Sequence, residues 1–324
     1  MKILLTGGLG LIGHNVVRRL LDLSHEISIT DTRTNYGIVP QGELDYLMTE
    51  RRNTISDVES RCHRIDIADC EGIDWMMRTY RPDIVIHLAS FPRQKVVNAN
   101  PQRGSRSMSE GLLNLCEASK SHGVGKFVYV SSSMVYGNFG DQVQEDALCC
   151  PQGQYGIMKL AGEWLVRDYT GRGSFDHVII RPSAVYGPRD VEDRVISRFM
   201  LSAMRGQTLK VNGPNETLDF TYVDDVADGI VAAALQSQAN NKTFNITRGR
   251  SHTLLDAANL AVRIVGRGSV EIHDRDPNFP SRGALNITAA RRDLGFDPQV
   301  DIEEGFKRYH EWLANSVYWS KKTV

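Results

Sequence analysis

A glycine-rich turn near the N-terminus, between an apolar strand and an amphipathic helix, is the feature that most constrains this chain. Residues 8–13 match G-x-G-x-x-G, and Gly7, Gly10 and Gly13 match the related spacing G-x-x-G-x-x-G. An apolar run at 2–5 precedes the turn, and apolar residues at helical spacing follow it. Glycines permit the tight turn and let a pyrophosphate approach backbone N–H groups at the helix N-terminus. The turn therefore predicts a dinucleotide-binding unit.

Asp31 supports this interpretation because it ends the next predicted strand. It lies 18 residues after Gly13, where a carboxylate can accept hydrogen bonds from a ribose diol. The same carboxylate would repel a 2′-phosphate, so NAD is favoured over NADP, although Arg33 works against that preference. The alternative is a glycine-rich turn followed by an incidental aspartate.

Strands and helices alternate through the first half of the chain. This order predicts an α/β fold with a Rossmann-type, doubly wound parallel sheet. The predicted strands are 2–5, 26–30, 61–65, 83–88, 127–131 and 177–181, the helices 12–21, 43–51, 72–80, 108–121 and 155–169, and later short strands 221–225 and 244–246.

The regular alternation weakens after Arg181, where Gly, Pro, Arg and Asn become more frequent. We expect an NAD-binding domain at 1–181, with returning segments at about 219–246. Residues 182–218 and 247–324 are expected to form a smaller, interleaved C-terminal substrate lobe.

Composition excludes several classes of protein. The 38 basic and 39 acidic side chains nearly balance, so no nucleic-acid or membrane partner is expected. No apolar run approaches the ~20 residues that cross a bilayer. The five cysteines form no C-x-x-C pair, which argues against a disulfide framework and a structural zinc site. We expect a cytoplasmic protein with no metal.

A second chemical signal is Tyr155 followed four residues later by Lys159, since this spacing puts both side chains on one helix face. Ser131–Ser133 ends a predicted parallel strand, where such sheets bind ligands. A free tyrosine titrates near ~10, and a neighbouring ammonium and an oxidised nicotinamide ring would favour its phenolate. The alternative is two solvated helix residues.

Several motifs occur in the order that one large family carries them. Over almost its whole length the chain resembles the extended short-chain dehydrogenase/reductase family, in its nucleotide-sugar epimerase and dehydratase branch. The motifs are TGGLGLIG at 6–13, DI at 66–67, HLAS at 87–90, YVSSSMVYG at 129–137, Y-x-x-x-K at 155–159, RPSAVYGP at 181–188, DFTYVDDV at 219–226, FNI at 244–246 and LGFDP at 294–298.

The resemblance implies NAD as the cofactor and a role for each matching residue. Tyr155 and Ser132 would be catalytic together with Lys159, which would also hold the nicotinamide ribose. The alternative for Asp66 is a strand-end cap, and the alternative for Pro182 is a turn. The expected cofactor contacts are Gly7, Gly10, Leu11, Ile12, Gly13, Asp31, Arg33, Asp66, Ile67, Leu88, Ala89, Ser90, Tyr155, Lys159 and Pro182.

One departure from the family concerns the reaction. Family dehydratases carry an Asp-Glu pair directly after the catalytic hydroxyl residue, and here those positions are Ser133 and Met134. Without that pair no general acid and base are available for eliminating water, so a 4,6-dehydratase is disfavoured. Ser133 is instead expected to contact the substrate.

Other departures from the family concern residues that bind a nucleotide diphosphate. Leu218, Ala184 and Met108 replace an arginine and two asparagines that many relatives carry, and each loss removes a polar contact. Arg189 and Arg282 are the expected substrate-binding cations. The alternative for each is a solvated surface arginine.

These observations predict an NAD-dependent epimerase of a sugar or sugar nucleotide, acting through a transient 4-keto sugar. A net NAD-dependent dehydrogenase and a non-catalytic, NAD-sensing protein are the alternatives. By resemblance alone, a homodimer that pairs the helices near 105–120 and 155–170 is expected.

Overall fold

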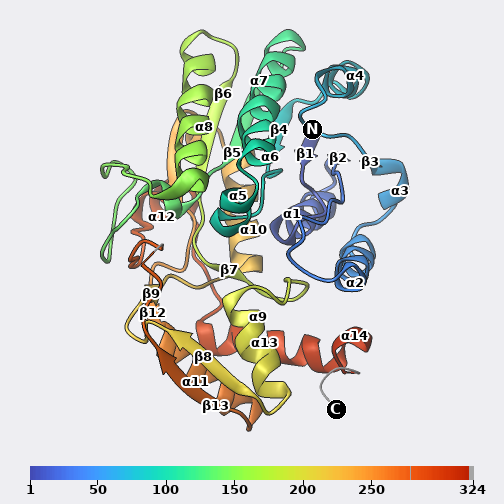
Figure 1. Ribbon diagram of the computed structural model, residues 1–324. Coiled ribbons are helices and arrows are strands. Elements are labelled where there is room, and N and C mark those ends of the chain that lie inside the picture. The colour runs from blue at the N-terminus through green and yellow to red at the C-terminus, as the bar shows by residue number, and fades with distance from the viewer. Residues whose placement is uncertain (278, 321–324) are drawn as a thin grey trace.

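A seven-stranded parallel sheet forms the centre of the computed structural model, which describes residues 1–277 and 279–320 (Figure 1). Its strand order is β11-β6-β5-β4-β1-β2-β3, and every neighbouring pair runs parallel. The predicted doubly wound sheet is therefore confirmed. The strands are β1 (Lys2–Thr6), β2 (Glu26–Thr30), β3 (Cys62–His63), β4 (Ile84–His87), β5 (Lys126–Val130), β6 (Asp176–Arg181) and β11 (Lys242–Asn245).

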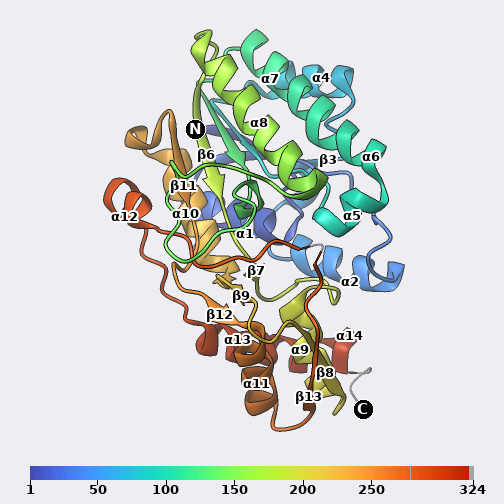
Figure 2. The same ribbon diagram turned by 60° about the vertical axis from the view of Figure 1, so that its left-hand side comes forward.

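Helices cover both faces of this sheet (Figures 1 and 2). Because successive strand residues point to opposite faces, Ile3 and Leu5 enter one core and Leu4 enters the other. The first core is closed by α1 (Leu11–Asp22), α10 (Val223–Leu235) and α12 (Thr288–Leu294), and the second by α4 (Cys70–Tyr80), α7 (Gly111–Ser121) and α8 (Gly153–Gly171).

A smaller lobe lies below the sheet in Figure 1 and has its own apolar core. The chain enters it after β6, returns to the sheet through α10 and β11, and leaves again. Its elements are α9 (Val195–Met204), β8 (Thr208–Asn212), β9 (Thr217–Leu218), β12 (His252–Thr253), α11 (Leu254–Val265), β13 (Ser269–His273), α13 (Ile302–Asn315) and α14 (Val317–Ser320).

Short elements connect these layers. They are α2 (Gln41–Arg52), α3 (Val58–Arg61), α5 (Gln94–Ala99), α6 (Pro101–Ser105), the π-helical turn Arg106–Glu110, the 3-10 turns Ser133–Val135 and Ser237–Ala239, β7 (Val185–Tyr186) and β10 (Thr221–Tyr222). Among the described helices, none combines the length and apolar character needed to cross a membrane.

The strand expected at 221–225 is wrong beyond Tyr222, because α10 begins at Val223. Asp224 and Asp225 lie in its first turn, where carboxylates are favourable to the helix dipole. Asp225 also accepts hydrogen bonds from the backbone N–H groups of Gln299 and Val300 at 2.9 and 3.0 Å. This contact fixes the C-terminal segment against the start of α10.

A buried ion pair between Glu163 of α8 and Arg181 of β6 joins this helix to the sheet. The guanidinium donates to the two carboxylate oxygens at 2.9 and 2.7 Å, and both residues are almost fully buried. Ser131, at the end of β5, donates to the same carboxylate at 2.6 Å. Arg181 also donates to the Tyr136 hydroxyl, which donates to Asn245 of β11, both at 2.8 Å. Four elements therefore meet at one bidentate pair.

We expect Arg181→Met to lower the free energy of unfolding by about 3–5 kcal/mol, because it removes the buried bidentate partner of Glu163 and leaves that carboxylate only the more exposed Arg167 at 3.3 Å. The matched control is Arg172→Met, which removes an exposed pair with Asp168 and should cost about 1 kcal/mol or less. Urea unfolding measures both. Equal effects of the two substitutions would contradict the importance of the buried pair.

Candidate active site

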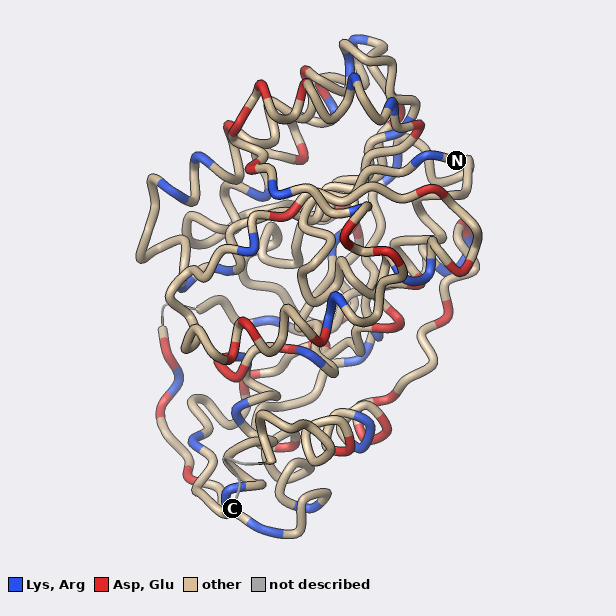
Figure 3. The backbone as a smooth tube through the Cα atoms, turned by 90° about the vertical axis from the view of Figure 1, so that its right-hand side faces the viewer, with Lys and Arg blue, Asp and Glu red and all other residues tan. Residues whose placement is uncertain are grey.

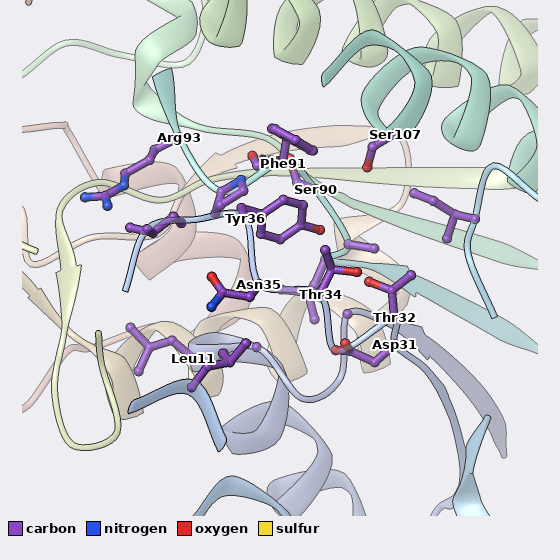
Figure 4. A pocket seen from close by; sticks show the side chains of 18 of the residues that line it. Leu11, Asp31, Thr32, Thr34, Asn35, Tyr36, Ser90, Phe91, Arg93 and Ser107 are labelled. Atoms are coloured by element: carbon purple, nitrogen blue, oxygen red, sulfur yellow. Dashed lines mark hydrogen bonds between the residues drawn. The ribbon is translucent and has the colours of Figure 1, made fainter. Parts of the chain in front are cut away.

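A cavity of ≈ 440 Å³ opens at the carboxyl ends of the central strands. The glycine turn, the segments after β2 and β4, and Asp190, Val191 and Arg194 line it together. Figure 4 shows the side chains that follow β2, from Asp31 to Tyr36, opposite those that follow β4, from Ser90 to Arg93. Ligands bind at this edge of open parallel sheets, since the loops diverge where the strand order reverses. In this sheet the reversal lies between β1 and β4.

The glycine turn leaves no room for side chains. Gly7 has a φ of +72°, and a Cβ atom there would lie 2.7 Å from the Ala89 nitrogen. A Cβ at Gly13 would lie 2.8 Å from the Gly8 Cα and would collide with the Gly7 carbonyl oxygen. The turn therefore presents bare backbone to the cavity, as a pyrophosphate requires.

Two carboxylates mark one end of the cavity. Asp31 accepts hydrogen bonds from the backbone N–H of Leu9 at 3.0 Å and of Arg33 at 2.8 Å, so it is fixed against the glycine turn. Asp66 lines the cavity beside Ile67. The Arg33 side chain instead turns to the Cys62 sulfur at 3.7 Å and is not among the cavity-lining residues.

The cavity is locally positive although the chain has a formal net charge of −1. Along the backbone, acidic and basic positions are interspersed in both lobes (Figure 3). In the cavity lining, five arginines face three aspartates, a formal excess of +2, which complements the two negative charges of a pyrophosphate. These residues are Arg51, Arg93, Arg103, Arg106, Arg194, Asp31, Asp66 and Asp190.

Tyr155 and Lys159 share one face of α8, beside the end of β5. The Lys159 ammonium donates to the Val130 carbonyl at 2.8 Å and lies 6.0 Å from the centre of the Tyr155 ring. Tyr155 lies near Ser132, whose side chain lowers the pKa of the tyrosine, and it packs against the small apolar cluster around Phe91. The three residues predicted to be catalytic therefore lie together.

The surroundings of these residues shift their acidities. Burial raises the pKa of Tyr155, while the Arg194 charge and the Ser132 hydrogen bond oppose that change. Burial also lowers the pKa of Lys159 to about 7, against the Glu163 carboxylate, which raises it. A cation added beside Tyr155 would favour its phenolate.

The three consecutive serines point to three different partners. Ser131 donates to Glu163, the Ser132 Oγ accepts from the Met134 backbone N–H at 3.2 Å and lowers the pKa of Tyr155, and Ser133 donates to the Ser183 hydroxyl at 3.1 Å. The Ser133 backbone N–H donates to the Pro182 carbonyl at 2.9 Å, so Pro182 supports the serine turn. Only the middle serine is directed at the tyrosine.

The two arginines expected at the substrate occupy different places. Arg282 lies beside the catalytic turn, with Nη1 3.7 Å from the Met134 sulfur, and lines a second cavity of ≈ 160 Å³ with Glu216. Arg189 lines neither of these two cavities, and its carbonyl oxygen accepts hydrogen bonds from Arg51. Leu218 is buried in the core of the smaller lobe.

Sequence reasoning missed the cavity arginines and the Glu163–Arg181 pair. Arg51 lies in a segment that reads as a polar insertion, and only the fold brings it beside the glycine turn. Glu163 could have been identified as a neighbour of Lys159 from the sequence, because it follows that lysine by four residues and thus shares its helix face.

Comparisons with known proteins place this site among related ones. The NAD dependent epimerase/dehydratase family matches residues 3–247. A UDP-glucose 4-epimerase of Mycolicibacterium smegmatis is 29% identical over 326 residues, covering 97% of this chain and 99% of that protein. A dTDP-glucose 4,6-dehydratase of Neisseria meningitidis serogroup B is 27% identical over 345 residues, covering 98% and 95%.

A solved structure of similar shape is the UDP-glucuronic acid 4-epimerase from Bacillus cereus in complex with UDP-glucuronic acid and NAD. It superposes with a TM-score of 0.87 at 28% identity, covering 96% of this chain and 98% of that chain. The resemblance noted in the sequence is thus confirmed.

The depressed pKa of Lys159 predicts a pH-dependent stability. Between about pH 7 and about 10 the unfolded chain, whose lysine titrates near ~10.4, binds more protons at this position than the folded chain. The free energy of unfolding should therefore rise with pH over this range, by up to about 1.4 kcal/mol per pH unit from this group. Lys159→Met should flatten the rise in urea titrations, and Lys120→Met, at an exposed position on α7, should not. Identical slopes in Lys159→Met and the wild type would contradict it.

Proposed function

This chain belongs to the NAD-dependent epimerase/dehydratase family, and from that premise we propose that it is an epimerase of a nucleotide sugar. It would oxidise the sugar to a transient 4-keto form and reduce it again on the other face. The observation that carries the proposal is the meeting of Ser132, Tyr155 and Lys159 at the end of β5, where Tyr155 packs in the same apolar cluster as Phe91, a residue of the cavity lining.

The cavity fits a dinucleotide. The glycine turn would receive the pyrophosphate, Asp31 the adenosine ribose, and Lys159 the nicotinamide ribose. The bare backbone of the turn and the local excess of positive charge support this assignment. When bound, NAD supplies the acceptor and later the donor of a hydride.

The chain's own residues move the proton. Tyr155, as the phenolate, would take the proton of the sugar hydroxyl, and Ser132 would donate a hydrogen bond to the same oxygen. Lys159 would stabilise the phenolate by its charge, and Arg194 would add to that effect. Returning the proton from Tyr155 to the reduced sugar completes the cycle.

Epimerisation is favoured over dehydration because the turn after Ser132 lacks a carboxylate. Ser133 donates to Ser183, and the Met134 side chain is buried. The nearby carboxylate of Glu163 is engaged by Arg181 and by Ser131. These positions therefore offer no acid–base pair for removing water from the sugar.

Arg282 would bind the anionic part of the substrate. It lies beside Met134 in the second cavity, and burial lowers the pKa of its guanidinium to about 10, so it stays charged near neutral pH. Its Nε atom is buried and has no hydrogen-bond partner in the described part of the chain. Relatives that act on UDP sugars make these the first substrates to test.

We also propose a homodimer that pairs α7 and α8 of two copies. These helices pack side by side (Figure 2), and large apolar side chains lie exposed on them. The exposed fractions are 44% for Leu113, 53% for Ile157 and 65% for Trp164. A second copy would remove this apolar surface from water.

Tyr155→Phe should lower turnover by about 10²–10⁴-fold, because the proton acceptor is lost. NAD⁺ affinity should change little. The control is Tyr169→Phe on the same helix, whose hydroxyl donates to Glu117 of α7. Conversion of UDP-glucose, UDP-glucuronic acid and dTDP-glucose is followed by chromatography, with reduced nicotinamide followed by absorbance.

Each outcome of this assay has a meaning. A C4-epimeric product without accumulated NADH supports the proposal. Stoichiometric NADH would establish a net dehydrogenase, and a 4-keto-6-deoxy product would establish a dehydratase. Full turnover by Tyr155→Phe would refute the role of the tyrosine.

Trp164→Glu should convert the dimer to a monomer, because it places a charge in the apolar contact. Light scattering after size-exclusion chromatography should then give the 36.3 kDa of one chain. Trp75→Glu on α4, also at an exposed tryptophan, should leave the mass unchanged. A wild-type monomer at micromolar concentration would refute the dimer.

A further inference from the structure

The strap, which we define as residues 187–194, joins β7 to the first helix of the smaller lobe. It carries Asp190, Val191 and Arg194 into the lining of the cavity that also contains the glycine turn. Arg189 of the strap has a φ of +70°, a backbone conformation that L residues rarely adopt. The strap therefore closes the cofactor cavity from the side of the smaller lobe.

One guanidinium connects the strap to the glycine turn. Arg51 of α2 is buried, and its Nε and Nη2 donate to the Arg189 carbonyl at 3.2 and 2.7 Å. Its Nη1 donates to the Leu9 carbonyl at 3.1 Å. Because a guanidinium is rigid and planar, these bonds fix the turn and the strap relative to each other.

A second side chain of α2 holds the strap without lining the cavity. Glu43 is fully buried, and its Oε1 accepts a hydrogen bond from the backbone N–H of Glu192 at 2.7 Å. Beyond α2, Arg93 in the loop after β4 donates to the Asp193 carbonyl at 2.8 Å and forms an ion pair with its side chain. Arg93 has a φ of +146°, so its backbone is strained where it meets the strap. The cofactor side of the molecule thus holds the strap at successive residues.

We propose that Glu43 and Arg51 are positioning residues that couple the dinucleotide loop to the strap, so that cofactor binding and closure of the strap favour each other. The inference rests on the proposed function, because an epimerase must keep its reduced cofactor until the keto sugar is reduced again. Coupling between two sites is reciprocal, so loosening the strap must weaken cofactor binding by the same factor.

Glu43→Leu tests this coupling from outside the cavity. It removes the acceptor for Glu192 N–H, and Glu43→Gln retains an acceptor of the same shape. Two quantities are measured on the full chain: hydrogen exchange of the strap amides, and the Kd of NAD⁺ by calorimetry. The control is Arg52→Met, whose side chain pairs with Glu59 instead.

We expect NAD⁺ to slow strap exchange in the wild type. Glu43→Leu should speed strap exchange and raise the Kd of NAD⁺ about tenfold, the effect of one lost charge-assisted hydrogen bond. Glu43→Gln and Arg52→Met should resemble the wild type. Hydrogen exchange of the β4 and β5 amides shows whether Glu43→Leu folds. If it does not fold, Arg51→Lys replaces it in both measurements, because lysine keeps the positive charge but cannot bond the Leu9 and Arg189 carbonyls together.

The coupling is refuted if Glu43→Leu speeds hydrogen exchange of the strap amides and yet binds NAD⁺ as tightly as the wild type. Unchanged strap exchange in that variant, or no effect of NAD⁺ on the wild-type strap, refutes it equally. These readouts need no turnover, so they remain decisive even if no sugar nucleotide proves to be epimerised.

Discussion

The buried pair between Glu163 and Arg181 holds the rest of the site in place. A carboxylate and a guanidinium out of water tolerate each other only in good geometry with further hydrogen bonds, and Ser131 and Tyr136 complete that geometry here. Glu163 lies one helical turn after Lys159 and two turns after Tyr155, so a pair that orients Glu163 also orients the face of α8 that carries these two residues. The same carboxylate keeps the Lys159 pKa from falling further. The Glu163–Arg181 contact therefore stabilises the fold and also fixes the carboxylate that affects the pKa of Lys159.

Local features allowed much of this structure to be predicted. The glycine turn, Asp31 and the apolar strands are recognised from residues close to one another in the sequence. The parallel sheet and the glycine-turn end of the cavity could therefore be predicted. The strand expected at 221–225 ended early because Asp225 binds backbone at residues 299 and 300, far along the chain. Arg51 and Arg93 could not be identified, since their partners in the strap lie 138 and 100 residues away along the chain. Arg33 was a reasonable candidate by position, yet its side chain turns to Cys62.

Net positive charge in this protein is concentrated at the cavity and not spread over the whole chain. The chain as a whole is almost neutral, so long-range attraction contributes little to ligand capture. The cavity gathers arginines from α2, from the loops after β4 and β7 and from the segment before α7, and sets them against three aspartates. Leu218 packs into the core of the smaller lobe and brings no charge to the cavity, so the cations there come from other positions. Arg194 is the member whose charge also reaches Tyr155.

The late return of β11 to the sheet bears on how the chain can reach its native state. β11 pairs with β6, and its Asn245 accepts the Tyr136 hydroxyl hydrogen bond, while α10 covers the apolar face of α1. A ribosome must therefore synthesise some 245 residues before the cofactor sheet has its last strand and its covering helix. Until then the nascent chain exposes an unpaired strand edge and an apolar helix face, both of which promote aggregation. The chain thus crosses between the two lobes before the sheet is complete, and a gene fragment ending at β6 would encode an incomplete sheet.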